Sequence, residues 1–198
     1  MTVWGLTGGI ASGKTTVANL FKQYDIPIIN VDVIAHDIQK NNDVIDLILN
    51  QFGGCVFNQE THEIDRKKLG NIVFNDINQL NKLNNIMQPL IKNKIKHLLL
   101  NYDQSRLVVL DIPLLFEQHY EKLVDKIIVV YVNKKTQIER LKKRNNLELK
   151  EALQRIQIQL SLEKKKQLAD YVIDNNQSIE QTKIQVIKLL RSYQNKGN

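Results

Sequence analysis

The glycine-rich segment GLTGGIASGKTT, at residues 5–16, constrains the fold of this chain more than any other part of its sequence. It follows an apolar run at Val3–Thr7 and opens an amphipathic pattern over Gly13–Lys22. The spacing G-x-x-x-x-G-K-[ST] is met by Gly8, Gly13, Lys14 and Thr15. An apolar strand, a glycine loop and a helix in this order form the context that the phosphate-binding P-loop requires. The sequence therefore predicts an α/β domain built around such a loop.

Each residue type in this loop has a chemical reason. Glycines let the backbone turn and approach a ligand without a Cβ clash. Successive N–H groups then form a nest for an anion at the N-terminus of a helix. We expect the Lys14 ammonium to reach the β- and γ-phosphates and the Thr15 hydroxyl to bind Mg²⁺. The predicted ligand is a nucleoside triphosphate with Mg²⁺, and a glycine-rich turn with an unrelated lysine is the structural alternative.

Five short apolar runs predict the strands of one sheet. They are rich in Val and Ile and do not alternate with polar residues, which is typical of strands covered on both faces. Helical patterns separate them, so a parallel sheet with right-handed crossovers follows. The expected strands are Val3–Thr7, Ile26–Asn30, Leu107–Asp111, Ile127–Val132 and Tyr171–Asp174. The expected helices are Gly13–Lys22, Val33–Leu49, Arg66–Phe74, Ile77–Leu100, Thr136–Arg144, Glu148–Gln167 and Ile179–Tyr193.

Two segments between the strands are too long to be single crossovers. Residues 33–105 are interpreted as a helical insert with a loop at Asn58–Glu63, and Pro89 is expected to kink or end a helix there. The strongly charged segment 134–167 is interpreted as two helices on either side of Asn145-Asn146. The predicted architecture is therefore α/β, with a five-stranded parallel sheet flanked by helices and two helical additions.

The composition limits the class of protein. A length of 198 residues suits one domain, and a net charge of +7 is compatible with a nucleic acid or with a polyphosphate ligand. The lysines are scattered, and the densest run, Lys164–Lys166, is interpreted as a solvated face, so we expect no nucleic-acid partner. We see no signal peptide and no apolar run of about 20 residues, so we expect a cytoplasmic protein without a membrane partner. The single Cys55 fits a reducing compartment.

Two acids follow predicted strands, at the edge of the sheet where open α/β folds bind ligands. Asp111 ends one strand, as the Mg²⁺-binding acid of a P-loop enzyme does. Asp32 comes just after another strand and is expected to orient or deprotonate the hydroxyl of an acceptor. A cap on the helix that begins near Val33 is the alternative role for Asp32. His36, one turn later, is expected to line the same cleft or to lie on the surface.

Arginines in the charged segment suit phosphoryl transfer. Arg140 and Arg144 are four residues apart and share one helix face, and Arg155 lies on the next helix. Guanidinium groups stabilise the charge of a transferring phosphoryl group, and a solvated basic face is the alternative. A GTPase is disfavoured, because Asn133–Thr136 ends in Thr where a carboxylate must bind guanine. A small-molecule kinase is favoured over a non-catalytic nucleotide-dependent binding module.

Together these motifs resemble those of the dephospho-CoA kinase family over nearly the whole chain. The segment DIPLLFE is the most specific, because a general P-loop kinase has no reason to carry it. The matching segments are GLTGGIASGKTT, Asp32–His36, Arg66 with Leu69-Gly70 and Val73-Phe74, Asp111–Glu117 (DIPLLFE), Arg140-Leu141 with Arg144, Arg155 with Gln159, and Ala169–Asn175. The resemblance implies that ATP phosphorylates the ribose 3′-hydroxyl of dephospho-CoA, which gives CoA and ADP in the last step of coenzyme A synthesis.

The same resemblance implies roles for individual residues. The insert would bind the acceptor, segment 134–167 would close over ATP as a lid, and Asn175 would lie near the adenine. The expected contacts to the ATP phosphates are Ala11, Ser12, Gly13, Lys14, Thr15 and Thr16. The expected acceptor-binding residues are Asp32, His36, Arg66, Leu69, Phe74, Asp111, Leu115, Phe116 and Arg155. The expected catalytic residues are Asp32, Lys14, Arg140 and Arg144, and the expected metal ligands are Thr15 and Asp111.

The chain departs from the family pattern at three places. Gln88-Pro89 stands where a His-Pro pair is usual, Asn175–Gln177 lacks a common glycine, and Ala11 replaces a frequent glycine.

Overall fold

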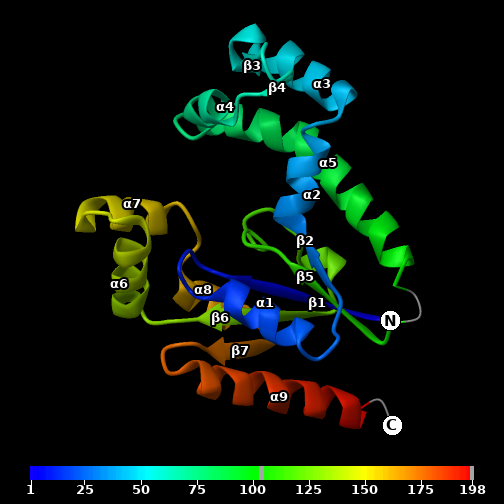
Figure 1. Cartoon of the computed structure of the whole chain (residues 1–198), viewed down its shortest axis with the longest axis vertical. Helices are drawn as coiled ribbons and strands as arrows, with labels where there is room; N and C mark the ends of the chain where they lie inside the picture. Colours follow the sequence, from blue (N-terminus) through cyan, green and yellow to red (C-terminus); the bar gives the residue numbers. More distant parts are fainter. Residues whose placement is uncertain (103–104, 197–198) are drawn as a thin grey trace. The chain divides into compact units, whose positions relative to one another are not determined.

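A computed structural model describes residues 1–102 and 105–196 (Figure 1). The chain divides into two compact units, Met1–Ile29 with Tyr102–Asn198 and Asn30–Asn101, which are described separately. Residues 103 and 104, at the end of the expected insert, lie outside the described part. Among the helices described, none has both the length and the apolar character that crossing a bilayer requires.

The first unit is built on the five-stranded parallel sheet that the sequence predicts. Its strand order is β2-β5-β1-β6-β7, with β1 in the centre and paired in parallel with β5 and β6. The strands are β1 (Thr2–Gly8), β2 (Ile28–Asn30), β5 (Leu107–Asp111), β6 (Lys126–Tyr131) and β7 (Tyr171–Asp174). Strand β5 is buried along its whole length, which agrees with its unbroken apolar run.

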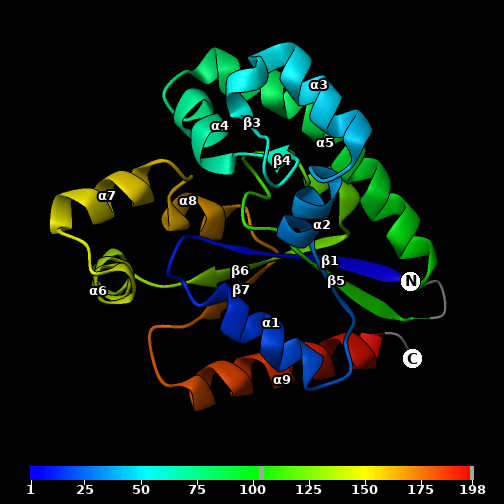
Figure 2. The ribbon, with the colours of Figure 1, turned by 45° about the horizontal axis from the view of Figure 1, so that its top comes forward.

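One face of this sheet is covered by two helices that lie side by side (Figure 2). These helices are α1 (Lys14–Lys22) and α9 (Ile179–Lys196). Trp4 lies in the core between sheet and helices, with its ring centroid 6.4 Å from that of Phe21 and 5.1 Å from that of Tyr193. This packing fixes the direction in which the chain leaves β1 and enters α1, and so positions the glycine loop.

The charged segment forms helices that follow β6. They are α6 (Lys134–Asn145), α7 (Leu149–Gln157) and α8 (Leu162–Gln167), and a 3₁₀ turn at Glu121–Leu123 precedes β6. The expected break at Asn145-Asn146 is confirmed, because Asn146 has a left-handed φ of 51° that ends α6. Helix α8 packs on β6, on the opposite side of the sheet from α1 and α9 (Figure 2).

The single helix expected at Glu148–Gln167 is wrong, because residues 158–161 are not helical. The N–H of Leu160 donates to Glu117 Oε1 at 3.0 Å instead of to a helical carbonyl. The Ser161 hydroxyl then caps α8 by accepting from the N–H of Lys164 at 3.3 Å. A contact distant in sequence therefore divides the helix.

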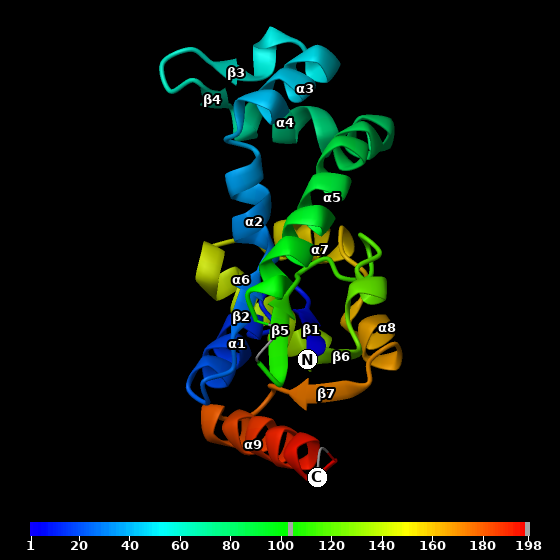
Figure 3. The same ribbon diagram turned by 90° about the vertical axis from the view of Figure 1, so that its right-hand side faces the viewer.

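The second unit is mainly helical (Figure 3). Its helices are α2 (Val31–Ile38), α3 (Asn42–Phe52), α4 (Arg66–Val73) and α5 (Ile77–Leu100), with a 3₁₀ turn at Gly54–Val56 and a small hairpin of β3 (Phe57–Asn58) and β4 (Glu63–Ile64). Helices α2, α3 and α4 all pack on the long helix α5. The side chains of α5 that are buried in this unit are Met87, Ile91 and Ile95.

The expectations for this unit have different outcomes. The single helix expected at Val33–Leu49 is wrong, because α2 ends in a turn where the Lys40 and Asn41 N–H groups donate to Asp37 and Ile38. The loop expected at Asn58–Glu63 is confirmed at residues 59–62, where it joins the two short paired strands β3 and β4, which were not predicted. Pro89 does not end α5, which continues to Leu100.

Candidate active site

The loop between β1 and α1 has the backbone conformation that a phosphate-binding loop needs. Gly13, the N-cap of α1, has a φ of 89°, and Ala11 has a φ of 60°. The N–H of Ser12 donates to the Gly9 carbonyl at 3.1 Å and closes the turn. The Ser12 hydroxyl is buried and has no hydrogen-bond partner in the described part of the chain. The loop therefore places a hydroxyl that makes no hydrogen bond within the described residues near the N-terminus of α1, where an anion is favoured.

Lys14 and Asp111 form an ion pair at the C-terminal edge of the sheet. Lys14 is the first residue of α1, and Asp111 is the last residue of β5, in register with Leu6 of β1. Their side chains are only 15% and 5% exposed, so the pair interacts in surroundings less polar than water. The expected phosphate-binding ammonium and the expected metal-binding carboxylate therefore meet at one point.

Asn175 and Arg140 lie beside the same loop. Asn175 Nδ2 donates to the Ser12 carbonyl at 2.8 Å, and its Oδ1 accepts from the Thr182 hydroxyl at 2.8 Å. Arg140 Nη2 donates to the Asn175 carbonyl at 2.9 Å. Both ends of the buried Asn175 amide are thus occupied in holding the loop against β7 and α9, and its contact with adenine stays a prediction.

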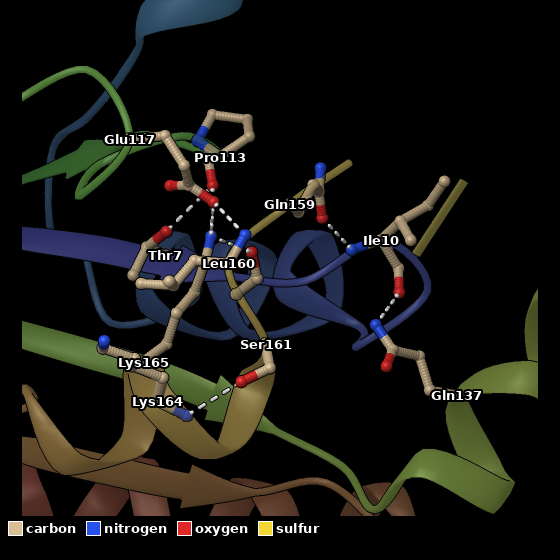
Figure 4. A network of polar contacts seen from close by, with 11 residues as sticks. Thr7, Ile10, Pro113, Glu117, Gln137, Gln159, Leu160, Ser161, Lys164 and Lys165 are labelled. Atoms are coloured by element: carbon tan, nitrogen blue, oxygen red, sulfur yellow. Dashed lines mark hydrogen bonds and ion pairs between the residues drawn. The ribbon is translucent and has the colours of Figure 1, made fainter. Parts of the chain in front are cut away.

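The other side of the loop is held by side chains whose part in the site the sequence analysis missed (Figure 4). Lys165 Nζ donates to the Gly8 carbonyl at 3.3 Å, and Gln137 Nε2 donates to the Ile10 carbonyl at 2.9 Å. Gln159 Oε1 accepts from the Ile10 N–H at 2.8 Å. The solvated face expected at Lys164–Lys166 is therefore wrong for Lys165, which is fully buried. Its position three residues after the buried Leu162, on the same face of α8, was the available signal.

The remaining expected arginines lie away from these contacts. Arg144 is exposed at the end of α6, and its Nε donates to Asn145 Oδ1 at 2.9 Å. Arg155 is exposed on α7. Arg140, by contrast, donates to the carbonyl of Asn175, the residue that holds the glycine loop.

The two apolar residues of DIPLLFE have different surroundings. Leu115 is fully buried, and its Cδ1 would lie 2.6 Å from a Cβ added to Gly5. Leu115 is therefore a core residue that depends on the glycine opposite it, and the expected contact with an acceptor does not fit its position. Phe116 is partly exposed and keeps surface for such a contact.

In the second unit, Asp32 and His36 lie on α2. The N-cap of this helix is Asn30, whose side chain accepts from the Val33 N–H at 3.1 Å. The alternative role of Asp32 as the cap is therefore wrong, and its carboxylate is exposed in the first turn. His36 is partly exposed, with Nδ1 3.5 Å from Asp37 Oδ1.

The other expected acceptor residues of this unit lie on or next to α4. Arg66 is exposed at the first position of the helix, which Asp65 caps by accepting from the Lys67 and Lys68 N–H groups. The hydrogen bond from the Lys68 N–H is the largest cause that lowers the pKa of the Asp65 carboxyl. The Lys68 charge and the hydrogen bond from the Lys67 N–H lower this pKa further, and desolvation opposes them. Leu69 is buried in the unit, whereas Phe74 is 73% exposed. An exposed aromatic ring of this kind suits a ligand better than a core role.

Comparisons with known proteins agree with this geometry. The sequence model of the family described as dephospho-CoA kinase matches residues 2–181. A dephospho-CoA kinase of Oceanobacillus iheyensis is 45% identical over 194 residues, which cover 96% of this chain and 97% of the relative. The chain belongs to the dephospho-CoA kinase family. It is therefore an ATP-dependent kinase of the P-loop class.

Solved structures support the same family. A dephospho-CoA kinase from Campylobacter jejuni superposes with a TM-score of 0.74 at 30% identity, and the match covers 99% of this chain and 98% of that one. A shikimate kinase from Bacteroides thetaiotaomicron, at 15% identity and a TM-score of 0.54, shares the fold alone.

The departures from the dephospho-CoA kinase pattern have structural consequences. Ala11 occupies a left-handed position, which explains why glycine is frequent there, because the same φ costs a residue with a Cβ about 1–2 kcal/mol. Gln88 lies in α5 of the second unit, and its Oε1 is buried without a partner in the residues that the structure describes. At Asn175–Gln177, which lacks the common glycine, the Asn175 side chain donates a hydrogen bond to the Ser12 carbonyl of the loop.

Gly13→Ala tests this contact. A Cβ at Gly13 would lie 2.0 Å from Asn175 Nδ2, and the φ of 89° is unfavourable for alanine. We expect a loss of about 2–3 kcal/mol in the free energy of unfolding, from the left-handed backbone and the broken Asn175 hydrogen bond. Urea titration would measure it, with Gly54→Ala as the control, since a Cβ there meets nothing within 4 Å. Equal stabilities of the two variants would contradict the assignment.

Proposed function

We propose that the chain transfers the γ-phosphate of ATP to the ribose 3′-hydroxyl of dephospho-CoA, with the loop Ala11–Thr16 holding the triphosphate. The observation that supports this assignment is the meeting of Lys14 and Asp111, together with the buried Ser12 hydroxyl of the same loop, which has no hydrogen-bond partner among the described residues. An ammonium, a hydroxyl and the amides of a helix N-terminus at one point match the charge of a polyphosphate tail.

Mg²⁺ fits the residues present. Magnesium in phosphoryl-transfer sites takes one or two carboxylates and completes its shell with phosphate oxygens and water. The Asp111 carboxylate and the Thr15 hydroxyl would hold it. The described residues contain no cluster of three or more acidic, histidine or cysteine ligands, so the remaining ligands would come from the phosphates and water. When bound, Mg²⁺ would neutralise negative charge on the triphosphate during the transfer.

Asp32 is proposed as the base that orients or deprotonates the acceptor hydroxyl. Asp32 is exposed in the first turn of α2, two residues after the end of β2, and Asn30 rather than Asp32 caps that helix. The second unit, Asn30–Asn101, is proposed to bind the rest of the acceptor, with Phe74 and Arg66 as exposed contacts. An aromatic ring and a guanidinium suit the apolar arm and the phosphates of dephospho-CoA, respectively.

The transfer is proposed to be direct and in line, without a phospho-enzyme. Segment 134–167 is proposed to close over ATP as a lid. Arg140 would then stabilise the charge of the transferring group together with Arg144 and Arg155. Closure would also exclude water that competes with the acceptor. For the compartment we propose the cytoplasm, where the exposed free thiol of Cys55 stays reduced.

An assay of ADP release across acceptors tests the function. We expect dephospho-CoA to accelerate ADP release at least about 100-fold over water. Shikimate, gluconate and nucleoside monophosphates should each leave the rate near the background. A faster rate with any of these acceptors than with dephospho-CoA would overturn the proposal.

A further inference from the structure

Lys165 is a buried lysine that the proposed chemistry does not use. Its side chain is fully buried on α8, although it stands between two exposed lysines. Nζ donates to the Gly8 carbonyl at 3.3 Å and to the Pro113 carbonyl at 3.1 Å, and it pairs with Glu117 Oε1 at 2.9 Å (Figure 4). An ammonium has three protons to donate, and each has an acceptor here.

Glu117 joins a third segment to this point. Its Oε1 also accepts from the Leu160 N–H at 3.0 Å, and Leu160 lies in the connection between α7 and α8. The hydroxyl of Thr7, the second-to-last residue of β1, donates to the same Pro113 carbonyl at 3.1 Å. The side chains of Lys165 and Glu117 therefore connect β1, the turn after β5, α8 and the segment that precedes α8.

The energetics of this pair argue against a role in stability alone. Taking both charges out of water costs several kcal/mol per ion, and an apolar pair of the same size is often as stable or more stable. Burial lowers the pKa of the Lys165 ammonium, Glu117 opposes this shift, and the charge of Lys14 adds to the lowering. Lys165 thus lies within electrostatic range of the lysine that we assign to the phosphates.

The peptide planes show what the pair holds in place. In a trans peptide the C=O and the following N–H point in opposite directions. When Lys165 fixes the Gly8 carbonyl, it fixes the direction of the Gly9 N–H. Gln137 fixes the Ile10 carbonyl, and with it the Ala11 N–H, in the same way. The Ile10 N–H is bound to Gln159 and is therefore not available to a phosphate.

We propose that Lys165, paired with Glu117, is a positioning residue for phosphoryl transfer. It orients the first peptide planes of the loop and ties the loop to the α7–α8 connection at the base of the proposed lid. The proposal rests on the function proposed above, because the loop must hold the triphosphate of ATP. Its consequence is that removal of the Lys165 charge disturbs catalysis by a route separate from stability.

The experiment compares Lys165→Met with Lys164→Met, which removes an exposed charge from the same helix. We expect Lys165→Met to lower kcat/KM for ATP about 100-fold, as a displacement of about 1 Å in a reacting group does. It should also weaken the binding of a non-hydrolysable ATP analogue, measured by calorimetry without acceptor. Lys164→Met should stay within about twofold of the wild type in both measurements.

The double variant Lys165→Met with Glu117→Gln separates positioning from stability. It removes the buried carboxylate that Lys165→Met leaves unpaired, so its melting temperature should recover toward that of the wild type. We expect its kcat/KM to remain at least about 30-fold below that of the wild type. Recovery of kcat/KM together with the melting temperature, or wild-type kinetics in Lys165→Met, would overturn the proposal. A wild-type enzyme that binds the analogue but does not phosphorylate dephospho-CoA would instead overturn the proposed function.

Discussion

Lys14→Ala is expected to lower kcat/KM for ATP by about 10²–10³-fold, because it removes the ammonium that stabilises the developing charge on the β- and γ-phosphates. Steady-state kinetics with dephospho-CoA in excess would measure this loss. Lys22→Ala, at the other end of α1, is the matched control, since Lys22 is exposed in the last turn. An unchanged kcat/KM in Lys14→Ala would contradict the assignment of the loop.

The same variant should also change stability, because Asp111 is only 5% exposed and would lose its ammonium partner. Breaking a pair this buried costs up to about 3 kcal/mol. Saturating ATP adds stability according to its affinity, about 2.7 kcal/mol at a concentration 100 times the Kd. The increase in melting temperature on adding ATP should therefore shrink in Lys14→Ala and persist in Lys22→Ala. Calorimetric scans with and without ATP would separate the two effects.

The strands and the loop could be predicted because their signals are local. Unbroken apolar runs mark β5 and β6, which are covered on both faces, and the motif spacing places the loop between β1 and α1. The predicted bounds of α5 agree with the structure at both ends. Here the N-cap at Asp76 and the apolar repeat of the sequence both indicate the same helix.

The errors arise where a contact distant in sequence overrides the local pattern. The division between α7 and α8 depends on the Leu160 N–H meeting Glu117, 43 residues away in sequence. Lys165 belongs to a run of lysines that is polar by composition, and only Glu117 and two carbonyl oxygens make its burial possible. Leu115 in DIPLLFE was predicted to contact a ligand, but its side chain packs in the core in the space left by the missing side chain of Gly5.

The places of the candidate site residues in the fold could be predicted more readily than the contacts that each residue makes. The pairing of Lys14 with Asp111 follows from their places at a helix start and a strand end. The use of the Asn175 amide to hold the Ser12 carbonyl does not, because no sequence pattern joins residues 163 positions apart. Side chains that hold a loop from behind are therefore the part of such a site that sequence reasoning finds last.

Asp32→Asn is expected to lower kcat by about 10²–10⁴-fold, the range that a positioned general base contributes. Asparagine keeps the size of the side chain but cannot accept the proton of the acceptor hydroxyl. The fold of α2 should be unchanged, because Asn30 and not Asp32 caps that helix. The affinity for a non-hydrolysable ATP analogue should also stay within about threefold, since Asp32 is assigned to the acceptor and not to the phosphates.

Asp37→Asn is the matched control, because Asp37 is an exposed carboxylate on the same helix, with a side chain that is 68% exposed. Both variants lose one negative charge from α2, so a general change in the charge of this unit would affect them equally. Only the loss of a base at the acceptor hydroxyl would lower kcat in Asp32→Asn and spare Asp37→Asn. If single-turnover rates with saturating ATP and dephospho-CoA are the same in the two variants, another group must accept the proton, and the role of Asp32 is refuted while that of Lys14 is not.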